Sequence, residues 1–316
     1  PDDMAGEQAE DGFSVIFPKT VNGGRPTLSA AFYSAFDCTP WNNDLVAEMA
    51  LRAIDAEQLG QDEVPDLLTI GFSQTDKVGH AYGPDSHEVM DSYLRLDRTL
   101  AAFLEQLDAK VGLSRCVIVL TADHGVCPLP EVTWTQDEAL VAGRFSGREL
   151  DDLVVRALDS AFGVLPESHY WVVRDNSGYH LNPAALRLKE LPAARVGAVL
   201  RDALRGSPVV ATAYTREQLT GSETLDEWGE MTRLSYHPDR SADVLFVEKP
   251  FHLARSVGTS HGTPHAYDTH VPQLWFGAGV KPGVDTERVA VEDIAPTLAG
   301  LLGVELPAEA RGRRLF

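Results

Sequence analysis

The sequence has few cysteines, few basic residues and no long apolar run. Three cysteines among 316 residues are too few and too scattered for a disulfide framework or a zinc-ribbon site. No segment approaches the roughly 18 consecutive apolar residues of a membrane-spanning helix, so we predict no membrane span. Lysine and arginine total 27 against 47 acidic residues, and the net charge of −20 argues against a nucleic-acid duplex or an anionic membrane as partner. An anionic small substrate stays compatible with this charge, because a bound metal ion can reverse the local field.

No secretory signal peptide is visible in the sequence. Residues 1–6 (Pro-Asp-Asp-Met-Ala-Gly) are acidic and polar, with neither a basic segment nor an apolar core. Apolar residues are plentiful in the chain as a whole, at 44%, which is enough to bury a large core and is too much for a disordered chain. We therefore expect one large α/β domain or two smaller ones.

The spacing of the apolar residues predicts an α/β core. Residues 43–60 and 86–110 carry apolar side chains at helical spacing, and residues 66–72 and 116–120 are short, nearly continuous apolar runs. Buried strands that alternate with helices are typical of a parallel sheet covered on both faces. The expected fold is an α/β/α sandwich with a central, mostly parallel sheet.

Residues 131–250 differ from the rest and predict a small α+β insertion. The pattern predicts helices near 147–162 and 191–205 and strands near 169–174, 178–181 and 208–214. On this interpretation residues 1–130 and 251–316 form the core, and residues 131–250 form the insertion.

Aspartate and histidine stand together at the ends of two predicted core strands. A loop after the first strand contains Asp76 and His80, and the second strand ends at Asp123-His124. Open α/β sheets place their ligands at such strand ends, and these side chains suit a divalent metal. A further histidine loop, residues 258–265, precedes another predicted strand. Each motif alone is as readily a turn or a cap, but their combination predicts a two-metal hydrolase.

Three motifs in combination resemble the alkaline phosphatase superfamily. They are Thr75-Asp76-x-x-Gly79-His80-x-x-Gly83-Pro84, Thr121-Ala122-Asp123-His124-Gly125, and Ser260-His261-Gly262 ahead of Tyr267-Asp268-Thr269-His270-Val271-Pro272. Within the superfamily the sequence is similar to the nucleotide pyrophosphatase/phosphodiesterase branch, and most similar to its phosphate-irrepressible bacterial alkaline phosphatases. The resemblance runs from about residue 30 to the C-terminus. It includes Ser235-Tyr236-His237-Pro238-x-Arg240-Ser241-x-Asp243, and Asp293-Ile294-Ala295-Pro296-Thr297-Leu298.

The resemblance implies two zinc ions and assigns their ligands. These are Asp76, His80 and His261 for one ion, and Asp123 and His124 for the other. His265 is the alternative to His261. His270 would at most contact a metal-binding residue without binding the metal itself. The implied activity is hydrolysis of a small phosphate ester, as in an alkaline phosphatase or a type I phosphodiesterase, with the region around Asp243 favouring the monoesterases.

The chain departs from the family pattern ahead of Asp76. The family's Thr or Ser nucleophile and a further Asp ligand of the second zinc come from an upstream strand and helix, and residues 1–75 contain neither. Thr20 is a poor substitute because no buried strand precedes it. We therefore expect the C-terminal part of a longer enzyme, inactive by itself. Since family members are usually exported, the expected location is the periplasm or the cell exterior.

Two alternatives stay open beside the hydrolase. A non-catalytic metal-binding module or pseudoenzyme would keep the Asp–His pairs without a nucleophile. The segment Cys38-Thr39-Pro40-Trp41-Asn42 is similar to the Cys-x-Pro-x-Arg site of sulfatases. Asn42 stands where that site needs arginine, however, and the Asp–His pairs favour zinc over the calcium of sulfatases.

Overall fold

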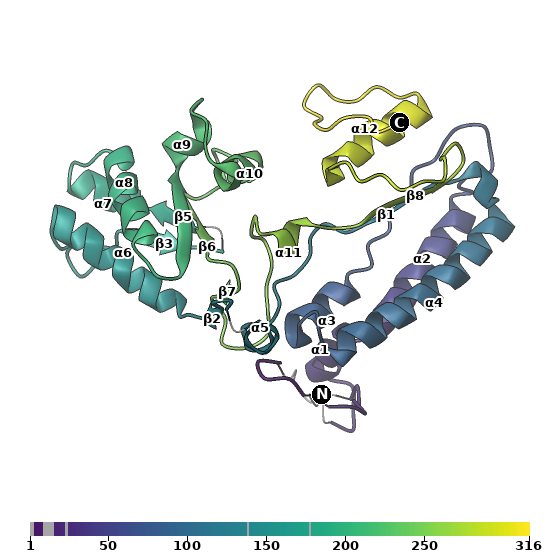
Figure 1. Cartoon of the computed structure of the whole chain (residues 1–316), viewed down its shortest axis with the longest axis horizontal. Helices are drawn as coiled ribbons and strands as arrows, with labels where there is room; N and C mark the ends of the chain where they lie inside the picture. Colours follow the sequence, from purple (N-terminus) through teal and green to yellow (C-terminus); the bar gives the residue numbers. More distant parts are fainter. Residues whose placement is uncertain (1–2, 9–15, 23–24, 138, 177) are drawn as a thin grey trace. The chain divides into compact units, whose positions relative to one another are not determined.

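The computed structural model describes residues 3–8, 16–22, 25–137, 139–176 and 178–316, and its helices and strands are shown in Figure 1. The chain forms two compact units. Unit 1 comprises Pro1–Asp3, Gln8–Val126 and His270–Phe316, and unit 2 comprises Met4–Glu7 and Cys127–Thr269. The predicted α/β class is confirmed, since helices and strands both contribute to the fold. Among the helices of the described residues, none has the length and hydropathy needed to cross a bilayer.

Residues 251–269 belong to unit 2 and pack within it. In this segment β7 (His252–Leu253) pairs in parallel with β2 (Gly143–Arg144). The His265 ring donates a hydrogen bond from Nε2 to the backbone carbonyl of Glu248, at 2.8 Å. The histidine loop therefore belongs to the same unit as the predicted insertion.

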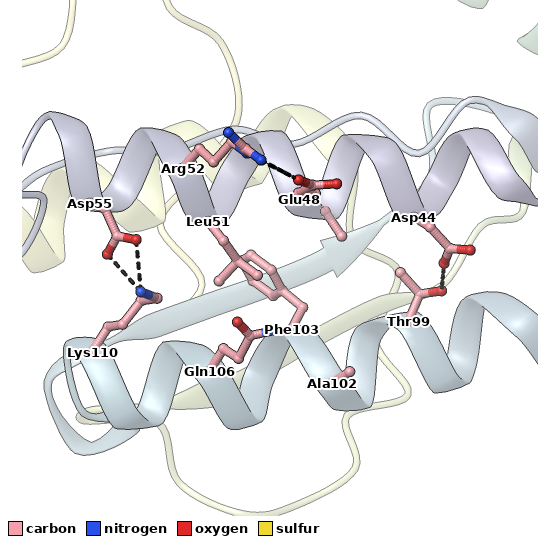
Figure 2. A pocket seen from close by; sticks show the side chains of 11 residues that line it. Asp44, Glu48, Leu51, Arg52, Asp55, Thr99, Ala102, Phe103, Gln106 and Lys110 are labelled. Carbon is pink, nitrogen blue, oxygen red and sulfur yellow. Dashed lines mark hydrogen bonds and ion pairs between the residues drawn. The ribbon is translucent and has the colours of Figure 1, made fainter.

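Unit 1 is built mainly from helices. They are α1 (Ala30–Asp37), α2 (Trp41–Ala56), α3 (Gln74–Tyr82), α4 (His87–Lys110) and α12 (Ile294–Leu302), with 3₁₀ turns η1 (Leu113–Arg115) and η2 (Val291–Asp293). Of these, α2 and α4 match the helices predicted at 43–60 and 86–110. The helices α2 and α4 bury a shared cluster of Ala47, Ala50, Ile54 and Phe103. Figure 2 shows polar contacts along their groove, where Lys110 Nζ binds both carboxylate oxygens of Asp55 at 2.7 and 2.8 Å. Such exposed pairs add little, so the apolar cluster holds the two helices together.

The sheet of unit 1 pairs β1 (Val117–Thr121) antiparallel with β8 (Gln273–Gly277). Gly277 ends this ladder with φ +106°, and a Cβ there would lie 2.0 Å from the carbonyl oxygen of Cys116, so only glycine fits. Residues 66–72, predicted as a buried strand, form no strand in the described part of the chain, and Leu67 is 66% exposed. An apolar run favours a strand only where a neighbouring strand supplies the ladder, and this segment has no such partner among the described residues.

Unit 2 has the α+β composition that the sequence predicts. Its four-stranded antiparallel sheet has the order β3 (Val172–Arg174), β4 (Gly178–Leu181), β6 (Val244–Glu248) and β5 (Val210–Thr215). The core is formed with α6 (Gly147–Phe162) and α8 (Ala193–Arg205), which bury Val154, Leu158, Val196, Leu200 and Leu204 completely. The remaining helices are α5 (Pro130–Gln136), α7 (Pro183–Leu188), α9 (Arg216–Thr220), α10 (Glu227–Ser235) and α11 (Ala266–Thr269).

Candidate metal centre

Asp76 and His80 lie on one face of helix α3, not in a loop as the sequence pattern suggested. The four-residue spacing places them one turn apart on the helix. The opposite side of α3 is anchored because Val78, Ala81 and Tyr82 are buried. Both candidate ligands are left partly accessible, with 32% of the Asp76 side chain and 26% of the His80 side chain exposed.

The spacing of these two side chains fits two ligands of one ion. Asp76 Oδ1 and His80 Nε2 are 3.5 Å apart, which is longer than an ordinary hydrogen bond. Two ligand atoms bound at about 2.0 Å to a tetrahedral zinc are about 3.3 Å from each other. The pair on α3 is therefore close to the geometry that zinc requires.

Asp123 and His124 follow the end of β1, where the sequence predicts them. His124 Nδ1 lies 2.8 Å from the carbonyl oxygen of Gly125, and a carbonyl can only accept, so Nδ1 carries the proton. The lone pair is then on Nε2, which lies 3.5 Å from Asp123 Oδ2. A histidine whose other nitrogen donates to a backbone carbonyl is oriented as a metal ligand. The Asp123 carboxylate is 88% exposed and accessible to an ion.

Within unit 1 these two pairs come from neighbouring segments. A Cβ on Gly79 of α3 would lie 4.0 Å from Cγ1 of Val126, which is ordinary van der Waals contact. Gly79 immediately precedes His80, and Val126 is two residues beyond His124. The packing of α3 against the segment after β1 therefore brings the carriers of both pairs together.

His261 belongs to unit 2, where the residues before it are fixed to Cys127. The backbone N–H of Cys127 donates to the carbonyl of Ser260 at 3.1 Å, and the Thr259 hydroxyl donates to the carbonyl of Cys127. Thr259 is completely buried. Directly after His261 the chain turns at Gly262, with φ +102°. His261 is thus held one residue from a contact with Cys127, which itself lies three residues beyond His124 in the sequence.

Arg144 also holds this loop, through the backbone carbonyls of Arg255 and Gly258, and no sequence motif indicates it. Its guanidinium forms a bidentate ion pair with Glu131, with N–O distances of 2.7 and 2.9 Å. Nη1 also donates to the backbone carbonyls of Gly258 and Arg255, at 2.9 and 3.2 Å. Only tertiary contact brings these groups together. The loop before His261 is therefore held by Arg144, whose ion pair with Glu131 is largely buried.

The other histidines considered as ligands lie in different surroundings. His265 is 5% exposed, stacks edge-on against Trp228 and uses Nε2 as a donor to the Glu248 carbonyl. These contacts give it a packing role and favour His261 as the ligand. His270 is exposed.

Buried titratable groups surround the loop in unit 2. Burial raises the pKa of the Cys127 thiol to about 12, so this cysteine is neither a thiolate ligand nor a nucleophile at neutral pH. Burial also raises the pKa of Glu248 to about 7, with Arg174 opposing the change and Asp268 adding to it. The pKa of Asp268 is raised by burial as well, against hydrogen bonds from Thr263 that lower it.

Asp243, in the motif that favours the monoesterases, is engaged in the fold. Its Oδ1 accepts from Arg216 Nε at 3.0 Å, and Oδ2 accepts from the backbone of Leu181 at 2.8 Å. Cys38 of the sulfatase-like segment ends helix α1, with its N–H bonded to the carbonyl of Ala35. Neither residue adds to the candidate metal centre.

The chain is similar to several known proteins. Residues 13–264 match the model of the family described as type I phosphodiesterase / nucleotide pyrophosphatase. The alkaline phosphatase PafA of Elizabethkingia meningoseptica is 32% identical over 277 residues, which cover 87% of this chain and 50% of that protein. The alkaline phosphatase PhoV of Synechococcus elongatus is 30% identical over 283 residues, covering 89% and 50%.

The fold comparison gives a similar result. The crystal structure of wild-type alkaline phosphatase PafA superposes with a TM-score of 0.88 at 29% sequence identity. The match covers 100% of this chain and 59% of that one. The chain therefore spans about half the length of the curated relatives it matches.

Proposed function

Because the chain belongs to the type I phosphodiesterase / nucleotide pyrophosphatase family, we propose that it is the metal-binding part of a zinc-dependent phosphate-ester hydrolase. The observation that carries this proposal is the pair of Asp–His sets, each with a carboxylate oxygen and an imidazole nitrogen 3.5 Å apart. The alkaline phosphatases among the relatives support a small phosphate ester as the substrate of the whole protein.

In this proposal Asp76, His80 and His261 hold one zinc, and Asp123 and His124 hold the other. Two zinc ions bound there would supply Lewis-acid stabilisation of the charge that develops in an in-line phosphoryl transfer. The residues of this chain act by fixing the ligands. The contact of Nδ1 with the Gly125 carbonyl keeps the lone pair of His124 on Nε2, and the contacts of Cys127 hold the loop of His261.

We further propose that the Thr or Ser nucleophile comes from a part of the protein outside this chain. The curated relatives are about twice as long as the matched region, and Thr20 is exposed. Large apolar side chains on the strands of unit 1 are also open to solvent, such as Leu274 at 54% exposure. Apolar patches on a protein surface mark interaction sites, and a further part of the protein would cover this one. The isolated chain should then have negligible turnover of a phosphate monoester with zinc present, and measurable turnover would refute this point.

Zinc analysis tests the site itself. We expect about one tightly bound zinc per chain, since three of the roughly four ligands that zinc needs are assigned to the first site. The double substitution Asp76→Ala with His80→Ala should abolish it. A matched control is Asp175→Ala with His180→Ala, which removes another carboxylate–imidazole pair, 2.7 Å apart, that carries no assigned role. Zinc that survives the first double substitution would refute the assignment.

A non-catalytic metal-binding protein is the second candidate. It would bind zinc as above, but the reading frame ahead of Pro1 would encode no Thr or Ser at the end of a buried strand. The same stretch of reading frame tests our proposal that the protein acts in the periplasm or outside the cell. An exported protein needs a secretory signal there, and cell fractionation would detect the result directly.

A further inference from the structure

Asp268 is a buried carboxylate, and one of its two oxygens accepts no hydrogen bond from the described residues. Its side chain lies in α11, seven residues after His261, and is 3% exposed. Oδ2 accepts two hydrogen bonds from Thr263, from the backbone N–H at 2.8 Å and from the hydroxyl at 2.6 Å. Oδ1 is equally buried and accepts no hydrogen bond from any described residue. A buried carboxylate oxygen without a hydrogen bond lowers the stability of the fold, so a carboxylate at this position calls for an explanation.

The loop holds Asp268 close to the histidines. Its backbone N–H donates to the carbonyl of His265 at 2.9 Å. Its side chain accepts hydrogen bonds from Thr263, which is two residues after His261. Burial raises the pKa of the Asp268 carboxyl, and electrostatic interaction with His261 and His265 acts in the opposite direction. His265 already commits its Nε2 proton to the Glu248 carbonyl. His261 is therefore the histidine whose ring can donate a hydrogen bond to Asp268 Oδ1.

We propose that Asp268 is a positioning residue for the zinc site, with Oδ1 accepting a hydrogen bond from the ring nitrogen of His261 that does not face the metal. This inference rests on the proposed function, because it takes His261 as a ligand. A carboxylate behind a ligating histidine fixes the tautomer and the orientation of the ring and makes it a stronger ligand. The two bonds from Thr263 hold the carboxylate so that its second oxygen is kept for this purpose.

The test is the zinc affinity of the full chain, measured by competition with a chromophoric chelator. Asp268→Asn preserves the shape of the side chain and should weaken zinc binding by roughly 10–100-fold. Asp175→Asn is the matched control, since it alters a carboxylate that pairs with His180 in the same unit, and it should leave the affinity unchanged. In a His261→Ala background, Asp268→Asn should cause no further loss, because the residue acts through His261.

The outcomes separate this inference from the proposed function. A His261→Ala chain that binds zinc like the wild type would overturn the ligand assignment, and the role of Asp268 with it. If His261→Ala weakens binding but Asp268→Asn changes the affinity less than about 2-fold, or weakens it equally with and without His261, only the positioning role is overturned.

A second measurement needs no variant. The long-range ¹H–¹⁵N spectrum of the zinc-loaded wild type should show a ring N–H of His261 that is protected from solvent exchange. A His261 ring proton that exchanges freely with water would refute the hydrogen bond to Asp268.

Discussion

Glu248 provides a quantitative test of the electrostatics of unit 2. This carboxyl ends β6, and burial raises its pKa from 4.5 to about 7. The folded state therefore holds the proton more tightly than the unfolded chain does. The stability penalty is absent below pH 4.5, grows between pH 4.5 and about 7 and is constant above that. A difference of about 2.5 pKa units corresponds to about 3 kcal/mol in the free energy of unfolding.

The substitution Glu248→Gln removes this penalty while keeping the side-chain shape. Arg174 is not left unpaired, because its Nε binds Asp151 at 2.7 Å. At pH 8 the variant should therefore be more stable than the wild type by up to about 3 kcal/mol, a rise in the melting temperature of unit 2 of roughly 6–12 °C. Below pH 4.5 the two proteins should melt at the same temperature.

The assay is thermal unfolding followed by circular dichroism from pH 4.5 to pH 8. Because the net charge of −20 also weakens the fold as pH rises, the difference between variant and wild type is the quantity to follow. Glu217→Gln, at an exposed position of α9, is the control and should not change the slope. A Glu248→Gln chain that is no more stable than the wild type at pH 8 would refute the reasoning.

Three further predictions concern the fold and the metal. Removal of zinc with EDTA should lower the melting temperature, since the proposed ligands tie together distant segments; an unchanged melting curve would count against an occupied site. Gly277→Ala should destabilise unit 1 by several kcal/mol in denaturant unfolding, because its Cβ would meet the Cys116 carbonyl at 2.0 Å. Arg144→Met should cost unit 2 about 3 kcal/mol by leaving the Glu131 charge unpaired, and adding Glu131→Leu should recover much of this loss, as a urea titration would show.

The local elements were predictable where one segment carries its own signal. The helix predicted at 147–162 coincides with α6, and the one predicted at 86–110 differs from α4 by a single residue, because each has a long apolar stripe at helical spacing. The sequence did not predict helix α3, because Asp76, Lys77 and Gly79 interrupt the pattern of apolar residues at helical spacing. The strand predicted at 66–72 was wrong, since a strand needs a ladder partner that local sequence does not specify.

The candidate site divides in the same way. The sequence alone identifies the two Asp–His pairs and the loop of His261, because metal ligands are recognised by residue type and short spacing. These motifs predicted the family, and the comparisons confirm it. The sequence by itself therefore determined which side chains are available to bind metal. Only the tertiary structure decided that Nδ1 of His124 is the protonated nitrogen, that His265 serves packing, and that Arg144 braces the loop before His261. The contacts of His265 and Arg144 join residues far apart in the chain, and the His124 tautomer depends on the backbone conformation that brings the Gly125 carbonyl to its ring, which no residue pattern encodes.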